Sequence, residues 1–460
     1  MTRQSTRRER VESALDSATR AARSFRTLDA EVFVLSSRVK SLAVEQDTVR
    51  SATSTDADFM FVRAVRDKRM GVSFTNLLDA KSIRRCIGSA RKLTSLTDRD
   101  PDWNGFPSAP KRYPIVKGTC DRALVDVELS TLGAKADEMV QAAQEEAVGV
   151  TVTDGSVDVT ERTVGVSNTE GLSAVTGETY IGVMCSSVSG RGGSVSPDCP
   201  YGMYSTSLDI DFEHIGSESG RIAMCCAVTA EPSTEDCEAV FSPVALGSDE
   251  AGLFCNILRG ALSGESAVRK NTLFVDRVGD RVASKAITIT DNPIAPSRAG
   301  SRPFDDEGMA TQRTELIKDG VLKGFLWDSY HASLAGKKST GSAVRNMSTG
   351  SVSTGPLFLH LKPGTKSLDE LVREVDRGYL VWSCQGAHTS SPETGMFSFV
   401  ASPGLLIEKG HIVGCVRGAM ISGNIADLMS NAEKVGSDLT DFGSTLMPSV
   451  LFTGVRVTTG

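Results

Sequence analysis

Long stretches in which apolar and polar residues alternate constrain the fold of this chain more than any other feature of its sequence. Residues 30–75 contain AEVFVLSSRVKSLAVEQDTVRSAT and FMFVRAVRDKRMGVSF, which alternate and are rich in Val and Phe. The alternation recurs in three later segments, residues 148–168, 179–190 and 207–214. A period of two is typical of strands with one buried face. We therefore predict a first domain built on an antiparallel sheet, with a hairpin turn at Asp154-Gly155.

Amphipathic helices are predicted around these strands. Residues 11–25 place Val11, Leu15, Ala18, Ala22 and Phe25 at helical spacing, and residues 77–93 and 130–147 repeat this pattern. Ser130 is a plausible N-cap for the last of them. Residues 97–114 hold four of the sixteen prolines and are predicted to form a linker across the surface.

The second half of the chain is predicted to be mostly β. The composition shifts near residue 230, so we place the domains at 1–228 and 229–460. Hairpins are predicted at Asp319-Gly320 and Lys409-Gly410. Only residues 251–264, AGLFCNILRGALSG, and residues 367–375 look helical there. The fold class is therefore α+β, with an N-terminal α+β domain followed by a β-rich domain.

Composition and charge exclude several classes of protein. A net charge of −7 argues against nucleic acid as the main partner. No apolar run approaches the ~18 residues that span a bilayer, so no membrane association is expected. The N-terminus is charged and lacks the apolar core of a signal peptide. The ten cysteines contain no CxxC pair, which favours reduced thiols in a cytoplasmic protein.

Zinc motifs built on paired histidines are absent from the sequence. The five histidines are His214, His331, His360, His388 and His411, and no two of them are four or five residues apart. This spacing excludes HExxH and HExxxH. Two weaker pairs remain, Cys384 with His388 and His411 with Cys415, each four residues apart. Two Cys and two His would suit zinc, but both pairs fall on predicted strands or turns.

Five segments together resemble the TldD/PmbA family, whose PmbA member is also called TldE. They are FSP at 241–243, AGLFCNILRGALSG at 251–264, NTLFVDRVGDRVASKAITITDNP at 271–293, the run from PFDDEGMATQR to GKKSTG at 303–341, and the run from SPETGMFSF to EKVGSDL at 391–439. The block DDEG…TQR…LIKDGVLKG is long and specific. The N-terminal strands and helices fit the family's first domain, so the resemblance covers nearly the whole chain.

The resemblance implies a fold and an activity. It implies an N-terminal α+β domain, a C-terminal domain that forms a partly open barrel, and a dimer, usually of one TldD-type and one TldE-type subunit. The dimer would be a cytoplasmic zinc metalloprotease that acts on unfolded, extended or modified peptides. The TldD-type subunit carries zinc on a helix with an HExxxH motif and adds a C-terminal Cys in a Cys-Gly-Lys run.

The motif residues are carried over one by one onto residues 251–264. Cys255 stands at the position of the first His, and Gly260 stands at the position of the second His. Asn256 stands at the position of the Glu, which would act as a general base on zinc-bound water. Arg259 falls at a position that the motif leaves free. No Cys follows Cys415. The resemblance therefore implies a TldE-type chain with no catalytic residue and no metal of its own, and zinc in a TldD-type partner.

Three functions remain open at this stage. The first is a non-catalytic subunit that supports the dimer and the peptide groove. The second is a homodimer with its own unusual metal site, drawing on Cys255, Cys384, His388, His411 or Cys415. The third is a peptide-binding scaffold without protease activity. Composition and spacing alone do not separate them.

Overall fold

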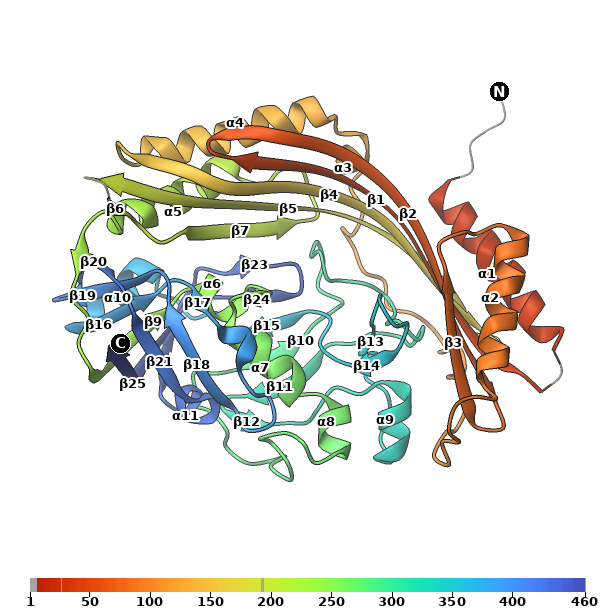
Figure 1. Ribbon diagram of the computed structural model, residues 1–460. Coiled ribbons are helices and arrows are strands. Elements are labelled where there is room, and N and C mark those ends of the chain that lie inside the picture. Colours follow the sequence, from red (N-terminus) through yellow and green to blue (C-terminus); the bar gives the residue numbers. More distant parts are fainter. Residues whose placement is uncertain (1–5, 26, 192–193, 460) are drawn as a thin grey trace.

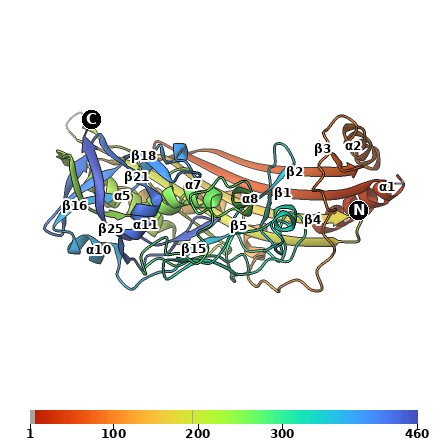
Figure 2. The same ribbon diagram turned by 90° about the horizontal axis from the view of Figure 1, so that it is seen from below.

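The computed structural model describes residues 6–25, 27–191 and 194–459 (Figure 1). A curved N-terminal sheet arches over a body formed by the C-terminal half of the chain (Figure 1). From below, the long strands run from that body to α1 and α2 at the opposite end (Figure 2). Within the described ranges, no helix is both long and apolar enough to cross a bilayer.

The N-terminal sheet is antiparallel, as the alternation predicts. Its order is β3-β2-β1-β4-β5, and both β6 and β7 pair with β5. The strands are β1 (Asp29–Glu45), β2 (Thr48–Arg66), β3 (Arg69–Thr75), β4 (Val150–Asn168), β5 (Ser173–Arg191), β6 (Ser194–Val195) and β7 (Cys199–Ser205). Its four longest strands curve together, and their concave face looks toward the C-terminal body (Figure 1).

Helices cover the convex face of this sheet in two pairs (Figure 1). The helices α1 (Arg7–Arg23) and α2 (Ala80–Leu93) cover one end, and α1 buries the predicted residues Val11, Leu15, Ala18 and Ala22. The helices α4 (Leu129–Glu145) and α5 (Phe212–Cys225) cover the other end, and the short α3 (Arg122–Asp126) precedes α4. A Cβ at Gly216 of α5 would lie 2.0 Å from the Met139 carbonyl oxygen, so only glycine allows this close helix pair.

Three local predictions in this half are wrong. Asp154-Gly155 lies inside β4, where the register shifts by a bulge between Val152 and Asp154, because the strand continues to pair with β5 on both sides. Ser130 is not the N-cap of α4; Glu128 occupies that position without a side-chain cap bond. Residues 207–214 are not a strand, because the Asp211 carboxylate accepts the His214 N–H and begins α5.

The C-terminal body contains three sheets, none of them closed into a barrel in the described part of the chain. The largest has ten strands in the order β17-β18-β21-β25-β9-β16-β19-β20-β8, with β22 on β25. These strands are β8 (Thr229–Ala230), β9 (Glu235–Phe241), β16 (Arg377–Val381), β17 (Cys384–Gln385), β18 (Met396–Ala401), β19 (Gly404–Glu408), β20 (His411–Val416), β21 (Ala419–Asn424), β22 (Ala432–Val435) and β25 (Val450–Thr459).

A six-stranded sheet in the order β12-β11-β10-β15-β24-β23 and a two-stranded sheet, β13-β14, complete the body. Their strands are β10 (Ile289–Asp291), β11 (Thr314–Lys318), β12 (Val321–Leu322), β13 (Ala343–Arg345), β14 (Val352–Thr354), β15 (Leu359–Leu361), β23 (Thr440–Asp441) and β24 (Thr445–Met447). Both predicted hairpins are present, and Asp319, Gly320, Lys409 and Gly410 all have positive φ.

Helices in the body are more numerous than the sequence predicts. The two predicted segments are α7 (Leu253–Ala261) and α10 (Leu368–Glu374). The others are α6 (Pro243–Gly247), α8 (Gly264–Val268), α9 (Ser329–Leu334), α11 (Ile425–Ser430) and the 3-10 helix η1 (Ala387–Thr389). These additional helices have at most six residues, too few for an apolar period to be visible in the sequence.

Two large hydrophobic clusters hold the layers together. One surrounds α7 and joins the ten-stranded and six-stranded sheets. The other joins the N-terminal sheet, α4 and α5 to the opposite face of the ten-stranded sheet, through residues such as Met139, Ile215, Trp382 and Leu405. Because the two halves share this second core, the boundary at 228/229 stays a prediction.

The predicted linker at 97–114 is irregular, but it does more than cross the surface. Trp103 and Phe106 are buried, and the Trp103 ring stacks on Tyr330 of α9 with centroids 6.1 Å apart. The Tyr113 hydroxyl donates a hydrogen bond of 2.9 Å to the Gly308 carbonyl oxygen. The segment therefore straps the N-terminal half to the C-terminal body.

A buried network of ion pairs also joins the two halves. Glu31 of β1 is fully buried and receives Arg63 of β2 at 2.6 Å and Arg345 of β13 at 2.5 Å. Arg63 also contacts the buried Glu307 at 2.9 Å. Burial alone would raise the pKa of Glu31, but the two guanidinium groups outweigh it and lower that pKa.

We expect Arg345→Met to destabilise the protein by about 3–5 kcal/mol, because it removes one of the two guanidinium groups that pair with the buried Glu31 carboxylate. Denaturant unfolding monitors this change. The loss should shrink progressively as the pH falls from the ordinary Glu pKa through the lowered folded-state pKa of Glu31, because protonation removes the buried negative charge. The control is Arg122→Met in the exposed pair with Asp126, which should change little. Equal effects of the two substitutions would contradict this role of the network.

Candidate functional site

The helix α7 lies inside the C-terminal body, and most of its surface is buried (Figure 1). Its buried residues are Leu253, Phe254, Cys255, Ile257, Leu258 and Ala261. The predicted helix and its apolar stripe are therefore confirmed. The three positions that the TldD/PmbA resemblance singles out are all on this helix.

Cys255 points into the protein interior. Its side chain is 1% exposed, and its Sγ lies 3.6 Å from Asp249 Oδ1. Burial raises the pKa of this thiol to about 12, and the nearby Arg259 guanidinium opposes the shift only in part. The thiolate is the form that binds metals and attacks substrates, so Cys255 is poorly suited to either role at neutral pH.

Asn256 and Gly260 offer no metal ligand. The Asn256 Nδ2 donates a hydrogen bond of 2.9 Å to the Gly252 carbonyl oxygen, which also accepts the Asn256 backbone N–H at 3.0 Å. A Cβ built on Gly260 would lie 2.8 Å from Cβ of Pro392, so a histidine would require that loop to move. Together with the protonated thiol of Cys255, these residues do not fit zinc.

The guanidinium group of Arg259, also on α7, lies beside the motif positions. Its Nη2 lies 2.7 Å from Asp249 Oδ1 and also donates to Ser444 Oγ, and Ser444 Oγ donates to the same carboxylate oxygen at 2.9 Å. No local sequence pattern predicts this cluster, because Asp249 precedes α7 and Ser444 is 195 residues further along the chain.

The weaker set of four ligands is not brought together. Cys384 is buried in the cluster around α7, and its Sγ lies 3.5 Å from the Ala245 carbonyl oxygen. Cys415 belongs to the other cluster, while His388 and His411 are exposed. Among the residues that the structure describes, no group of three or more His, Cys, Asp or Glu side chains is placed to hold a metal ion.

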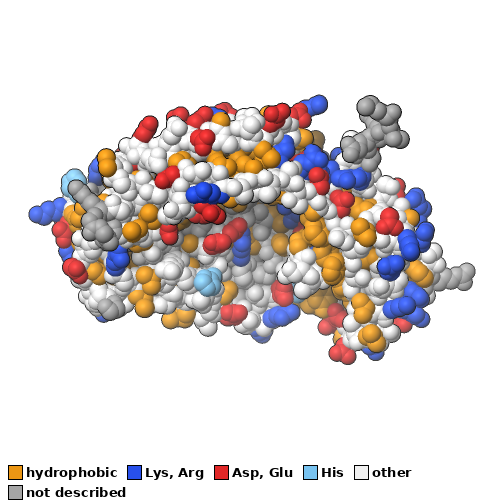
Figure 3. Space-filling view, turned by 45° about the horizontal axis from the view of Figure 1, so that its top comes forward, with side chains coloured by type: hydrophobic (Ala, Val, Ile, Leu, Met, Phe, Trp, Pro, Cys, Tyr) orange, Lys and Arg blue, Asp and Glu red, His pale blue; other side chains and the backbone are white. Residues whose placement is uncertain are grey.

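A groove lies between the concave face of the N-terminal sheet and the C-terminal body. It consists of two cavities of about 390 and 440 Å³ that share Tyr204, Asp249 and Phe442. The space-filling view shows this face of the molecule hollowed below the layer that carries α4 (Figure 3). Asp249 therefore connects the groove to α7 through Arg259. Sequence reasoning missed the groove, because its lining comes from both halves of the chain.

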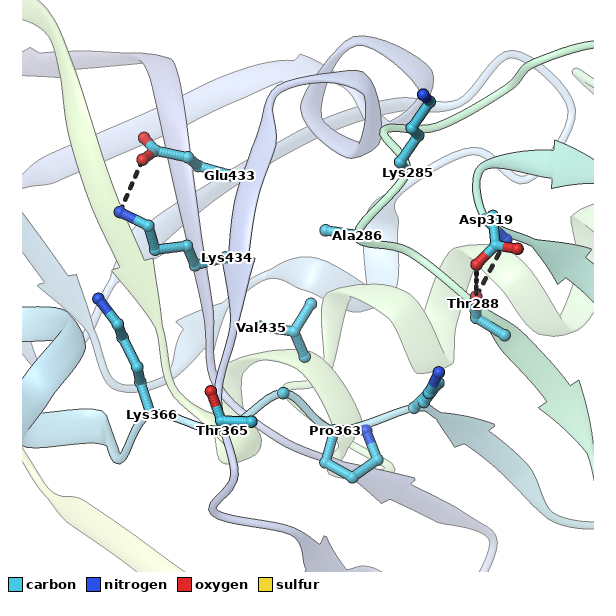
Figure 4. A pocket seen from close by; sticks show the side chains of 12 residues that line it. Lys285, Ala286, Thr288, Asp319, Pro363, Thr365, Lys366, Glu433, Lys434 and Val435 are labelled. Atoms are coloured by element: carbon cyan, nitrogen blue, oxygen red, sulfur yellow. Dashed lines mark hydrogen bonds and ion pairs between the residues drawn. The ribbon is translucent and has the colours of Figure 1, made fainter.

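A separate pocket on the C-terminal body has four lysines in its lining but does not form an anion site (Figure 4). Lys434 and Lys366 both pair with Glu374, and Lys434 also lies 2.8 Å from Glu433. Lys285 points away from the other labelled lysines (Figure 4). Because these ammonium groups do not converge, the pocket gives no reason to place a function there.

Comparison with known proteins agrees with the resemblance. Residues 234–459 match the PmbA/TldA metallopeptidase C-terminal domain, and residues 30–94 match PmbA/TldA metallopeptidase domain 1. The chain is 32% identical to metalloprotease PmbA of Escherichia coli O157:H7 over 221 residues, 46% of each protein. It is 29% identical to a TldD homolog of Buchnera aphidicola, of which the match spans 47%. The chain thus spans about half the length of these two relatives.

Other matches extend over nearly the whole chain. A Haemophilus influenzae TldD homolog is 24% identical over 90% of this chain and 86% of its own length. The crystal structure of TldE from Thermococcus kodakarensis superposes with a TM-score of 0.88 at 27% identity, covering 98% of this chain and all of that one. A Thermotoga maritima structure at 22% identity, with a TM-score of 0.85, shares the fold. The chain belongs to the PmbA/TldD family of metallopeptidase-like proteins.

Proposed function

We propose that this chain is the non-catalytic, TldE-like subunit of a cytoplasmic zinc metalloprotease complex that processes unfolded or modified peptides. Zinc and the catalytic residues would belong to a TldD-type partner. The observation that carries this proposal is α7, where Cys255, Asn256 and Gly260 are committed to packing and backbone contacts. The 27% identity to a TldE structure over 98% of the chain supports it.

In this proposal the chain contributes to the enclosure of an extended peptide. The groove between the two layers is lined by the edge strand β7 and by apolar side chains, which suit a peptide that adds a strand to a sheet. A homodimer with its own metal site is less well supported, because the four alternative ligands are divided between two cores and the surface. A peptide-binding scaffold without a protease partner would use the same groove.

Co-expression with the TldD-type chain of the same genome tests the proposal. The two chains should co-purify as a complex, and the complex should cleave an unstructured peptide faster than the partner alone, because the groove would be complete only in the complex. Size-exclusion chromatography and a peptide cleavage assay measure both properties. The proposal fails if the chains do not associate and the partner cleaves the peptide equally well alone.

Cys255→Ser should leave the peptidase activity of the complex nearly unchanged, because the Cys255 thiol is buried and burial raises its pKa to about 12, so it is protonated at neutral pH and is not exposed to substrate. The matched control replaces the first motif histidine of the partner by alanine, which should abolish cleavage. A large loss of activity in the Cys255→Ser complex, with the complex still assembled, would mean that α7 takes part in the chemistry.

Restoring the motif in this chain should not restore a zinc enzyme. We expect the triple variant Cys255→His, Asn256→Glu, Gly260→His to lose about 1–3 kcal/mol of unfolding free energy, mainly because a side chain at 260 overpacks against Pro392. Denaturant unfolding and metal analysis of the purified chain measure the outcome. Stoichiometric zinc with unchanged stability would contradict this expectation and show that α7 is only three substitutions from binding zinc.

A further inference from the structure

One cavity of the groove runs along an edge strand of the N-terminal sheet. The strand β7 pairs with β5 on one side only, and five consecutive residues of it, 200–204, line the cavity of about 440 Å³. This volume lies within the range of ~300–1,000 Å³ that is typical of ligand sites. The other side of the cavity is formed by the loop at 248–251, which leads into α7.

The outer edge of β7 has free backbone groups. The Pro200 carbonyl faces away from β5, because it accepts a hydrogen bond of 2.7 Å from the Trp382 indole. In an antiparallel strand, residues two and four positions further on face the same way, which places the Gly202 and Tyr204 backbone groups on the outer edge. In the described part of the chain, these two residues have no backbone hydrogen bond to any element other than β5. Because β23 packs against β7 and Trp382 occupies the Pro200 carbonyl, only the Gly202 and Tyr204 groups of this edge are left for an extended peptide.

The floor of the cavity is apolar and partly exposed. The Tyr204 ring lies over Gly182 of β5. A Cβ at this position would come within 2.7 Å of the ring, so the absence of a side chain at Gly182 allows the ring to pack there. Tyr204 and Met184 remain 38% and 42% exposed, which is unusual for large apolar groups in a concave site. These surfaces suit the aliphatic part of a long side chain.

The charged groups that line the cavity are all acidic. They are Asp158 of β4 and Asp249 and Glu250 of the loop before α7, and no Lys, Arg or His is among the described residues of its lining. Asp249 forms an ion pair with Arg259. Asp158 accepts a hydrogen bond from the Ser41 hydroxyl, and in the described ranges neither Asp158 nor Glu250 forms an ion pair. Burial raises the pKa of Tyr204, and the nearby carboxylates of Asp249 and Asp158 raise it further.

We propose that this cavity selects basic peptides: an extended segment pairs with the free edge of β7 and places a Lys or Arg side chain over Tyr204, with its cationic end between Asp158 and Glu250. The inference rests on the proposed function, in that it takes the groove to be a peptide site, and adds the chemical class of peptide that it prefers. The backbone edge provides affinity for any extended chain, and the acidic wall provides the selectivity.

Isothermal titration calorimetry of the full chain with three capped eight-residue peptides tests the inference. The peptides are identical except for a central Lys, norleucine or Glu, and acetylation removes the amino-terminal charge. The Lys peptide should bind at least tenfold more tightly than the norleucine peptide, and the Glu peptide more weakly still. The preference should shrink as salt rises, because these carboxylates are partly exposed. A norleucine peptide with a free amino terminus that equals the Lys peptide would overturn the side-chain assignment.

Two variants assign the preference to the acidic wall. Asp158→Asn combined with Glu250→Gln should reduce the Lys preference to about threefold or less, while the norleucine peptide binds as before. The matched control is Glu170→Gln, an exposed carboxylate outside the cavity lining, which should keep the preference intact. A Lys preference that survives in the double variant contradicts the proposal. Peptides with N-methyl groups on alternate backbone amides should bind weakly if β7 pairs with them.

The outcomes separate this inference from the proposed function. If all three peptides bind with equal affinity, the groove is a peptide site and only the selectivity for basic peptides is wrong. If none binds either to the chain or to its complex with the TldD-type partner, the peptide-enclosing role itself is wrong.

Discussion

The groove depends on a buried charge network that fixes the N-terminal sheet against the C-terminal body. Glu31 and Arg63 come from two strands of the sheet, and Arg345 and Glu307 come from the body. Because an unpaired charge in this interior would be costly, the two layers are held in one relative position. Arg345 also donates to the Gly350 and Asp306 carbonyl oxygens and lines the groove, so the same side chain that locks the layers shapes the space between them.

The helix α7 is held by packing at the positions where the resemblance implies zinc ligands in a TldD-type chain. Its apolar residues complete the core that joins two sheets, and Gly260 permits close approach of Pro392. Arg259 extends from the same helix to Asp249, and so a fixed cation of the protein lies beside the groove. The helix thus completes this core and contacts the groove through the Arg259–Asp249 pair.

The sequence predicted the regular parts of the fold and missed the parts that depend on distant contacts. The long strands, α1 and the turns at Asp319-Gly320 and Lys409-Gly410 follow from local patterns. At Asp154-Gly155 a sequence that favours a hairpin lies in a bulged strand, because pairing with β5 outweighs the turn propensity. The motif positions on α7 were placed by resemblance alone. The Glu31–Arg345 pair joins residues 314 positions apart, which no local pattern can reveal.

In the proposed complex, zinc belongs to the partner and not to this chain. Native mass spectrometry of the assembled complex, with the subunits ejected separately in the gas phase, tests it most directly. We predict that one zinc ion stays with the TldD-type subunit and that this chain leaves with its metal-free mass. A zinc ion that accompanies this chain in stoichiometric amount would contradict the account.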